Sequence, residues 1–109
     1  MAQTLDLTFI QGDDYVASVV AKNSNGTAIN LSGYSVAGKV RNRYSDSNYL
    51  LDIAPTIASD VSGIINIDIP ATGTASLPVT EAVYDIEMYQ GATVTRLIEG
   101  NVKILPQVM

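Results

Sequence analysis

YDIEMYQGATVTRLIEG, residues 84–100, is the stretch of sequence that decides the fold. Two runs of strand-forming residues flank the dipeptide Gln90-Gly91, and this pattern is typical of a β-hairpin. A two-residue loop at this dipeptide predicts that Tyr89 pairs with Ala92, and the other pairs follow from that one. The hairpin therefore sets the register around which we expect the remaining strands to be arranged.

Opposite charges and apolar partners match in this register. Asp85 is predicted to lie opposite Arg96, and Tyr84 opposite Leu97, which are favourable cross-strand pairs. A three-residue loop would instead place Ile86 against Arg96 on the apolar face. The shorter loop is therefore favoured.

Further extended runs come before and after the hairpin, with turn signals about every 8–12 residues between them. Residues 15–22 carry apolar side chains on both faces, which predicts a central strand. The alternation in residues 64–69 places Ile65, Ile67 and Ile69 inward. Gly100 is expected to break the last ladder. The other predicted extended runs are residues 4–10, 27–31, 34–43, 49–58 and 102–104.

The segments between these runs have recognisable turn chemistry. Asn25-Gly26 suits a tight turn, and Pro55, which cannot donate to a ladder, marks an edge or a bulge. The polar residues 42–48 predict an exposed loop. Residues 71–81 lack a period of two and predict a loop with one helical turn. This crossover puts Tyr84 in a position like that of the corner tyrosine of sandwich folds.

About seven or eight strands of this kind predict an all-β fold. We expect residues 1–109 to form a single domain, an antiparallel β-sandwich of immunoglobulin-like type. A small Greek-key barrel is the alternative.

The composition excludes several classes of function. The chain has 109 residues, a net charge of −5, and neither cysteine nor histidine. Catalytic triads, Cys-His pairs and His- or Cys-ligated metals cannot form within one such chain. With no basic run, binding to nucleic acid or to an anionic membrane is not expected. The N-terminal residues lack the features of a signal peptide, and no apolar run approaches transmembrane length.

Carboxylates are the remaining candidates for chemistry. Asp85 and Glu87 share one strand face, and we interpret that face as solvated, so no catalytic dyad and no enzyme activity are predicted. Gly12, Asp13 and Asp14 could contribute oxygen ligands to a calcium ion. A strand-to-strand turn in which Asp bonds its own backbone is the favoured interpretation, so no metal or cofactor is predicted.

A small basic and aromatic cluster is the candidate docking patch. Arg41, Arg43 and Tyr44 lie next to Tyr49 at the mouth of the polar loop, and Tyr89 is predicted at the tip of the hairpin. Tyr and Arg are enriched among the residues that dominate interface energetics. An ordinary polar rim explains the same residues equally well.

Several motifs together carry a family resemblance that covers nearly the whole chain. The chain resembles small virion structural proteins of tailed bacteriophages, particularly of marine and cyanobacterial phages. It is also similar to the N-terminal immunoglobulin-like domain of phage baseplate upper proteins. The motifs are Gln-Gly-Asp (11–13), Asn-Gly-Thr-Ala-Ile-Asn-Leu-Ser-Gly-Tyr (25–34), Val-Ala-Gly-Lys-Val-Arg (36–41), Tyr-Asp-Ile-Glu (84–87) and Val-Thr-Arg-Leu-Ile-Glu-Gly (94–100).

The resemblance implies a β-sandwich in the virion, made in the host cytoplasm, with no catalytic residues. It implies other virion proteins as partners, contacted in multiple copies within a symmetric assembly. A tail or baseplate adaptor is preferred over a capsid decoration protein. The alternative function is a carbohydrate- or surface-binding immunoglobulin-like module, which should show exposed stacking aromatic side chains.

Overall fold

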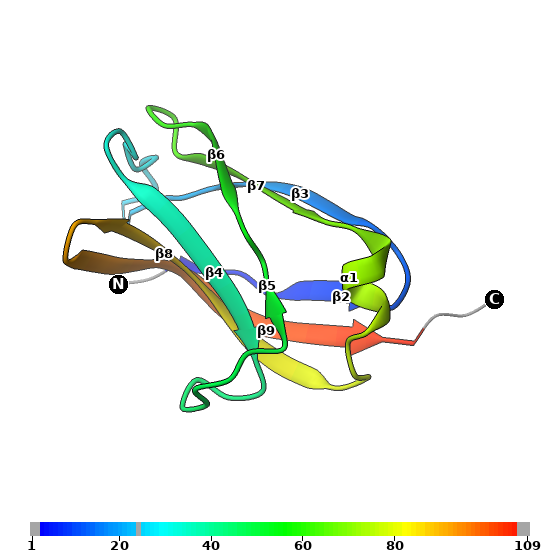
Figure 1. Cartoon of the computed structure of the whole chain (residues 1–109). Helices are drawn as coiled ribbons and strands as arrows, with labels where there is room; N and C mark the ends of the chain where they lie inside the picture. Colours follow the sequence, from blue (N-terminus) through cyan, green and yellow to red (C-terminus); the bar gives the residue numbers. More distant parts are fainter. Residues whose placement is uncertain (1–2, 24, 107–109) are drawn as a thin grey trace.

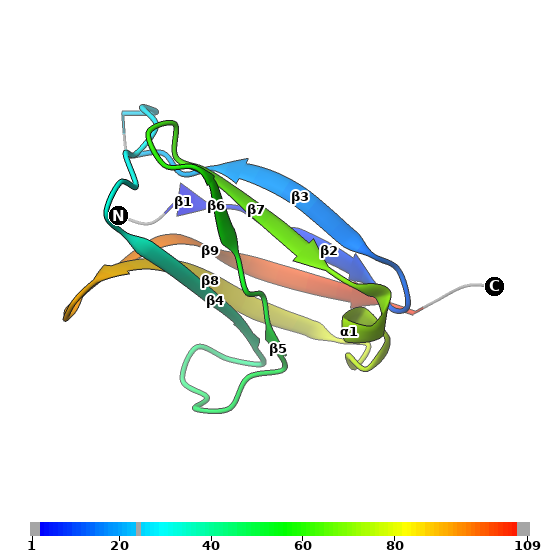
Figure 2. The ribbon, with the colours of Figure 1, turned by 45° about the horizontal axis from the view of Figure 1, so that its top comes forward.

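The computed structural model describes residues 3–23 and 25–106, which form two β-sheets packed face to face (Figure 1). The larger sheet contains β1 (Gln3–Thr4), β2 (Leu7–Ile10), β4 (Ser35–Arg41), β5 (Leu51–Asp52), β8 (Glu81–Gln90) and β9 (Thr93–Leu105). The smaller sheet contains β3 (Tyr15–Val20), β6 (Thr56–Ser59) and β7 (Ile64–Ile69). A short helix, α1 (Ala71–Ala75), lies at one end of the sandwich (Figure 2). The predicted all-β, two-sheet architecture is confirmed.

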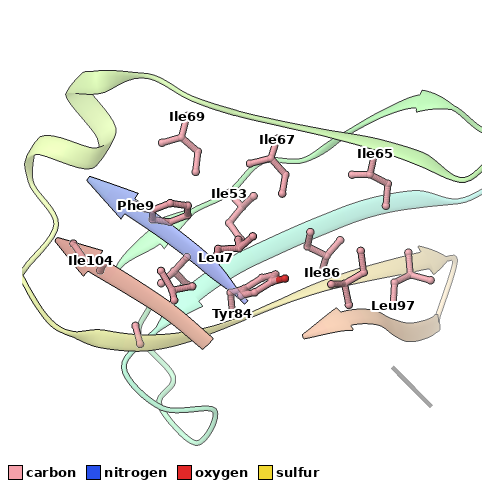
Figure 3. Close-up of a cluster of buried hydrophobic side chains, with 14 of the residues drawn as sticks. Leu7, Phe9, Ile53, Ile65, Ile67, Ile69, Tyr84, Ile86, Leu97 and Ile104 are labelled. Atoms are coloured by element: carbon pink, nitrogen blue, oxygen red, sulfur yellow. The ribbon is translucent and has the colours of Figure 1, made fainter. Parts of the chain in front are cut away.

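The core lies between the sheets and follows the period-two patterns of the strands. Ile65, Ile67 and Ile69 of β7 point into it, as predicted, toward Tyr84 and Ile86 of β8 (Figure 3). None of these five side chains is more than 2 % exposed. Alternation along each strand therefore determined which residues the core contains.

The first strands pair in a way that the sequence did not indicate. β1 and β2 both run parallel to β9, at the edge of the larger sheet, whereas all other pairs are antiparallel. The expected purely antiparallel sandwich is therefore wrong. The turn at residues 11–14 carries the chain from the larger sheet to the smaller one, so β2 and β3 do not form a hairpin.

β3 is an edge strand, and its predicted central position is wrong. The order of the smaller sheet is β3-β7-β6, so β7 is its central strand and β3 pairs with β7 alone. Val16 of β3 is 73 % exposed. Apolar residues on both faces of β3 reflect an apolar outer surface and not burial on two sides.

The hairpin register differs from the predicted one. The two-residue loop consists of Gly91 and Ala92, so Gln90 pairs with Thr93 and Tyr89 with Val94. The predicted Tyr89–Ala92 pair is therefore wrong. Gly91 has a φ of 58°, and a left-handed glycine early in the loop suits a hairpin turn of this length.

A β-bulge then shifts the register again. Glu87 pairs with Arg96 and Ile86 with Ile98, which leaves Leu97 as an extra residue in β9. A bulge of this kind places two successive side chains on one face. Leu97 and Ile98 are accordingly both buried, at 3 % and 0 % exposure. The apolar alternation along β9 shifts by one residue at this point, and the bulge lets the apolar residues after it still face the core.

The ladder does not break at Gly100. β9 continues through this residue, which pairs with Tyr84. A Cβ atom at Gly100 would lie 2.1 Å from the carbonyl oxygen of Leu5. Glycine is required here because the backbones of β9 and the β1–β2 connection approach so closely.

The Tyr84 side chain closes this junction. Its hydroxyl donates a hydrogen bond of 2.5 Å to the carbonyl oxygen of Leu5, and Asn101 N–H donates to the Asp6 carboxylate at 3.0 Å. The two bonds satisfy backbone groups where the parallel ladder is interrupted between β1 and β2. The Tyr84 hydroxyl bonds the N-terminal segment and not a residue just upstream, so the predicted corner-tyrosine contact is wrong.

Residues 27–31 form only an isolated bridge at Ala28, and the predicted run 49–58 is divided between β5 and β6 of different sheets, so these two strands were wrongly predicted. The predicted helical turn and polar loop agree with the structure. The single helical turn is α1, and the polar loop of residues 42–48 is largely exposed. Pro55 lies between β5 and β6, where the chain leaves one sheet for the other, and Ala54 before it has a φ of 48°. Gly26 has a φ of 82°, as its turn requires, while Ser24 of that turn lies outside the described residues. No helix among the described residues is long and apolar enough to span a membrane.

We expect Gly100→Ala to destabilise the fold by about 3 kcal/mol, because the added methyl group would overlap the Leu5 carbonyl and the backbone would have to separate. Chemical denaturation measures the change. Gly91→Ala is the control: this glycine lies in the hairpin loop between β8 and β9, and nothing lies within 4 Å of the added atom. It should cost about 1 kcal/mol through its positive φ alone. Equal losses in the two variants would contradict the close approach at Gly100.

Alkaline pH should test the Tyr84 hydroxyl. Burial raises the pKa of this phenol above its ordinary value. Its contribution to stability is therefore complete below about pH 10, the value of an unfolded tyrosine, and declines as the pH rises further. The free energy of unfolding should fall by up to about 1.4 kcal/mol per pH unit above pH 10 on account of this group.

Tyr84→Phe should flatten that decline and cost about 1–3 kcal/mol at pH 7, because the partly buried Leu5 carbonyl loses its donor. Urea unfolding between pH 7 and pH 11.5 measures both effects. Some alkaline decline should persist in the variant, since burial also raises the pKa of Tyr15. Parallel curves for the wild type and the variant would show that Tyr84 does not carry the effect.

Candidate interaction surface

The outer face of the larger sheet carries a compact group of charged side chains, which we call the charged face. Strand alternation places these residues on one side of β4, β5, β8 and β9, and cross-strand pairing brings them together. They are Lys39, Arg41, Asp52, Asp85, Glu87, Arg96 and Glu99.

Asp85 is the centre of the charged face. It is only 5 % exposed, and its carboxylate lies 3.3 Å from Arg96 Nη2 and 3.7 Å from Arg41 Nη1. Arg96 also contacts Glu99 at 3.1 Å. A carboxylate so far removed from water needs this compensation, because burial of an unpaired charge is costly.

The predicted Asp85–Arg96 contact exists, but the residues are not directly opposite. Asp85 pairs with Glu99 and Arg96 with Glu87 in the observed register. The bulge at Leu97 changes the alignment of the strands, and the long Arg96 side chain reaches Asp85 diagonally. The predicted direct Asp85–Arg96 and Tyr84–Leu97 pairs are therefore wrong.

A second ion pair lies at the edge of the charged face. Lys39 Nζ lies 2.9 Å from an Asp52 carboxylate oxygen, and the Lys39 ammonium lowers the pKa of that carboxyl. The other Asp52 oxygen accepts a bond from Ala54 N–H at 2.9 Å. Tyr49 stacks beneath Lys39, with its ring centroid 4.8 Å from Nζ. An exposed aromatic ring is thereby fixed beside paired charges.

Tyr44 folds the polar loop back onto the sheet. Its hydroxyl lies 3.2 Å from the Tyr84 carbonyl oxygen and 3.3 Å from that of Gly100, so one proton is shared between two acceptors. Arg96 lies over its ring, 5.2 Å from the centroid. Burial, with the charge of Glu99 adding to it, raises the pKa of the Tyr44 phenol. The ring nevertheless stays 46 % exposed, so a loop residue presents aromatic surface in a held position.

The structure brings together three of the five predicted docking residues. Arg41, Tyr44 and Tyr49 border the charged face through the contacts described above. Arg43 is exposed in the loop beside them. Tyr89 lies apart, at the hairpin tip, where it pairs with the exposed Val94.

Sequence reasoning did not include Lys39, Arg96 and Asp85 in the docking patch. Alternation alone puts each of them on the outer side of its strand. Their neighbourhood depends on β4 lying beside β8, and residues 42–80 separate those strands in the chain. Matching opposite charges between candidate neighbouring strands is the signal in the sequence that could have suggested this group of residues.

The acidic turn at residues 11–14 holds α1 in place. An oxygen of Asp14 accepts a bond from Ala71 N–H at 2.7 Å, and Gln11 Nε2 donates to the Leu77 carbonyl at 2.6 Å. The buried Thr74 hydroxyl donates to the Asp13 carbonyl at 2.7 Å. Asp14 thus bonds the backbone of α1 and not that of its own turn, which differs from the favoured interpretation. Within residues 3–23 and 25–106, no three acidic side chains form a group that could hold a metal ion.

Two shallow hollows mark the described surface. One of about 270 Å³ lies beside β2, β8 and β9 and includes Asp6, Glu81 and Lys103. The other, of about 200 Å³, lies under the hairpin and includes Lys22, Met88 and Arg96. Each hollow is lined by a few charged side chains together with backbone and apolar groups. The convergent polar groups that usually orient a small ligand are not gathered in either hollow.

Comparison with known proteins yields only distant structural likenesses. No protein-family model matches the sequence, and no curated protein matches it. Among solved structures, a family 123 glycoside hydrolase from Clostridium perfringens is similar at a TM-score of 0.37 and 14 % identity. The match covers 97 % of this chain and 23 % of that one, so this chain spans about a quarter of the hydrolase.

A double-mutant cycle should reveal the ion pair at the centre of the charged face. We expect Asp85→Ala and Arg96→Ala to couple by about 0.5–1 kcal/mol in the free energy of unfolding, because each removes the same contact. The coupling should weaken at high salt. A parallel cycle of Asp85→Ala with Arg43→Ala should give no coupling, since Arg43 lies in the exposed loop. Coupling of equal size in both cycles would contradict the geometry.

Proposed function

We propose that the chain is a non-enzymatic structural component of a tailed-phage virion. It docks on other particle proteins through its surface, as a tail or baseplate adaptor in preference to a capsid decoration protein. The observation that supports this most directly concerns the residues of the resemblance. Their buried side chains and turns hold the fold together, and their outward-facing side chains supply most of the charged face.

Two of the shared motifs illustrate this. Gln11 and Asp13 of the first motif bind the Leu77–Thr74 region, and Tyr84 of the fourth binds the Leu5 carbonyl. Side chains used in this way favour a scaffold that acts by shape.

The strand arrangement supports an immunoglobulin-like classification within this proposal. The order β9-β8-β4-β5 over β3-β7-β6 has the arrangement of an immunoglobulin variable-type domain, with its G, F, C and C′ strands facing B, E and D. The first strand belongs to the larger sheet in this chain. Tyr84, near the start of β8, occupies the strand that carries the corner tyrosine in such domains.

The charged face, with Tyr44 and Tyr49 at its border, is the surface we assign to docking. Its basic side chains are already held by acidic neighbours, and both tyrosine rings have a cation stacked on them. Preorganised aromatic and arginine side chains lose little conformational entropy on binding. A polar, aromatic protein surface is the partner that this chemistry fits.

Mass spectrometry of purified particles, separated into heads and tails, tests the proposal. We expect the chain in the tail fraction, in multiple copies per particle. Its presence in heads alone would favour capsid decoration over the adaptor role. Its absence from both fractions would overturn the virion proposal.

Variants then test the docking surface. Tyr49→Ala should lower incorporation into particles about tenfold or more, the loss that corresponds to ~1.4 kcal/mol at an interface hot spot. Val61→Ala is the matched control, because Val61 is comparably exposed but lies in the turn between β6 and β7. Equal incorporation of both variants, each folded normally, would remove the charged face from the proposal.

A further inference from the structure

Among residues 3–23 and 25–106, no strand pairs with the outer edge of β3 in the smaller sheet. β3 bonds β7 on one side, and the Ala21 N–H continues that ladder by donating to the Gly63 carbonyl at 2.8 Å. Because backbone bonds alternate along an antiparallel strand, the N–H and C=O groups of Val16, Ser18 and Val20 point the other way. Within the described chain, no strand pairs with them, and β3 is the outermost strand of its layer (Figure 2).

This edge lacks the features by which proteins block strand addition. Residues 15–20 contain no charge, proline or glycine, and their register with β7 has no bulge. Natural edge strands usually carry at least one of these protections. The Gln3 side chain reaches the end of this edge, where its oxygen accepts a bond from Lys22 N–H at 3.0 Å. The edge from Val16 to Val20 is therefore open to another strand.

We propose that a second copy of this chain pairs with this edge, antiparallel, about a twofold axis through Ser18. Val16 then lies opposite Val20 of the second copy, and Ser18 lies opposite its own counterpart. The outward-facing N–H and C=O groups of all three residues gain partners. Side-chain faces also agree, because a twofold axis perpendicular to the sheet keeps outer residues on the outer side.

Charge complementarity selects this occupant and this register. Asp14 and Lys22 flank the uncharged strand, and the Ser18-centred register brings each opposite the other in the second copy. Two opposite-charge contacts thus close the two ends of the pairing. A register centred on Ala17 would instead place Asp14 opposite Val20 and leave Lys22 opposite Gly12.

Net charge also favours the β3 edge over other contacts between two copies. Two copies that each carry −5 repel one another at most contacts. The β3 edge is uncharged and its flanks are complementary, so self-pairing here avoids that repulsion. The inference does not depend on the proposed place in the virion.

Disulfide trapping tests the register directly, since the chain contains no cysteine. Ser18 pairs with itself in a hydrogen-bonded position, where Cα atoms lie about 5.5 Å apart, within the range that a disulfide spans. Ser18→Cys should therefore form a covalent dimer readily under mild oxidation. Asn66→Cys is the matched control: Asn66 lies beside Ser18 on the same outer face, 2.6 Å away through its side chain, but on the central strand. Equal cross-linking of the two variants would overturn the proposal.

Sedimentation of the unmodified chain supplies the second readout. We expect a monomer–dimer equilibrium whose dissociation constant rises about tenfold or more in Lys22→Asp, because two acidic pairs replace the two complementary ones. Lys103→Asp makes the same change in net charge on β9 and should leave the equilibrium close to that of the wild type. A wild-type chain that stays monomeric at millimolar concentration would overturn the proposal. This holds even if a strand of another protein binds the β3 edge, because the proposed occupant is a second copy of this chain.

Discussion

The hydrogen bond from the Tyr84 hydroxyl to the Leu5 carbonyl, which passes over Gly100, is the constraint on which the rest of the structure depends. It joins β8 to the N-terminal segment across β9, so three strands meet at one point. The parallel pairs of β1 and β2 with β9 lie on either side of that point. Without a glycine at position 100 the N-terminal strands could not approach β9, and the larger sheet would end there.

A second local feature links the core to the surface. The bulge at Leu97 changes which side of β9 faces inward, so Leu97 and Ile98 are both buried while the outer side chains shift by one position. Arg96 thereby reaches the nearly buried carboxylate of Asp85. The arrangement of charges on the outer face is thus a consequence of how the core is packed, and the Tyr44 loop adds to it by bonding the backbone of the same strands.

The two surfaces discussed above belong to different sheets. The charged face covers the outer side of the larger sheet, and the open β3 edge belongs to the smaller one. A protein with this division could pair with its own copy through one surface and bind a different protein through the other. Such a combination suits a component of a symmetric particle, where each subunit makes like and unlike contacts at the same time.

Local patterns in the sequence determined much of this protein. The inward positions of Ile65, Ile67 and Ile69, the helical turn at α1 and the exposed loop all follow from spacing and turn chemistry, because those signals act within a few residues. The aromatic and basic residues of the loop were also predicted to form a docking patch from residue type alone, and that role stays a prediction.

The tertiary structure decided what depends on distant parts of the chain. The parallel pairing of β2, the edge position of β3, the bulge at Leu97 and the assembly of Lys39, Asp85 and Arg96 all require strands far apart in sequence to lie side by side. A period of two tells which way a side chain points, but it does not tell which strand is its neighbour. Gly100 illustrates the difference. A glycine in a predicted strand indicates a break in that strand, and only the close approach of Leu5 shows that two segments of the chain meet at this residue.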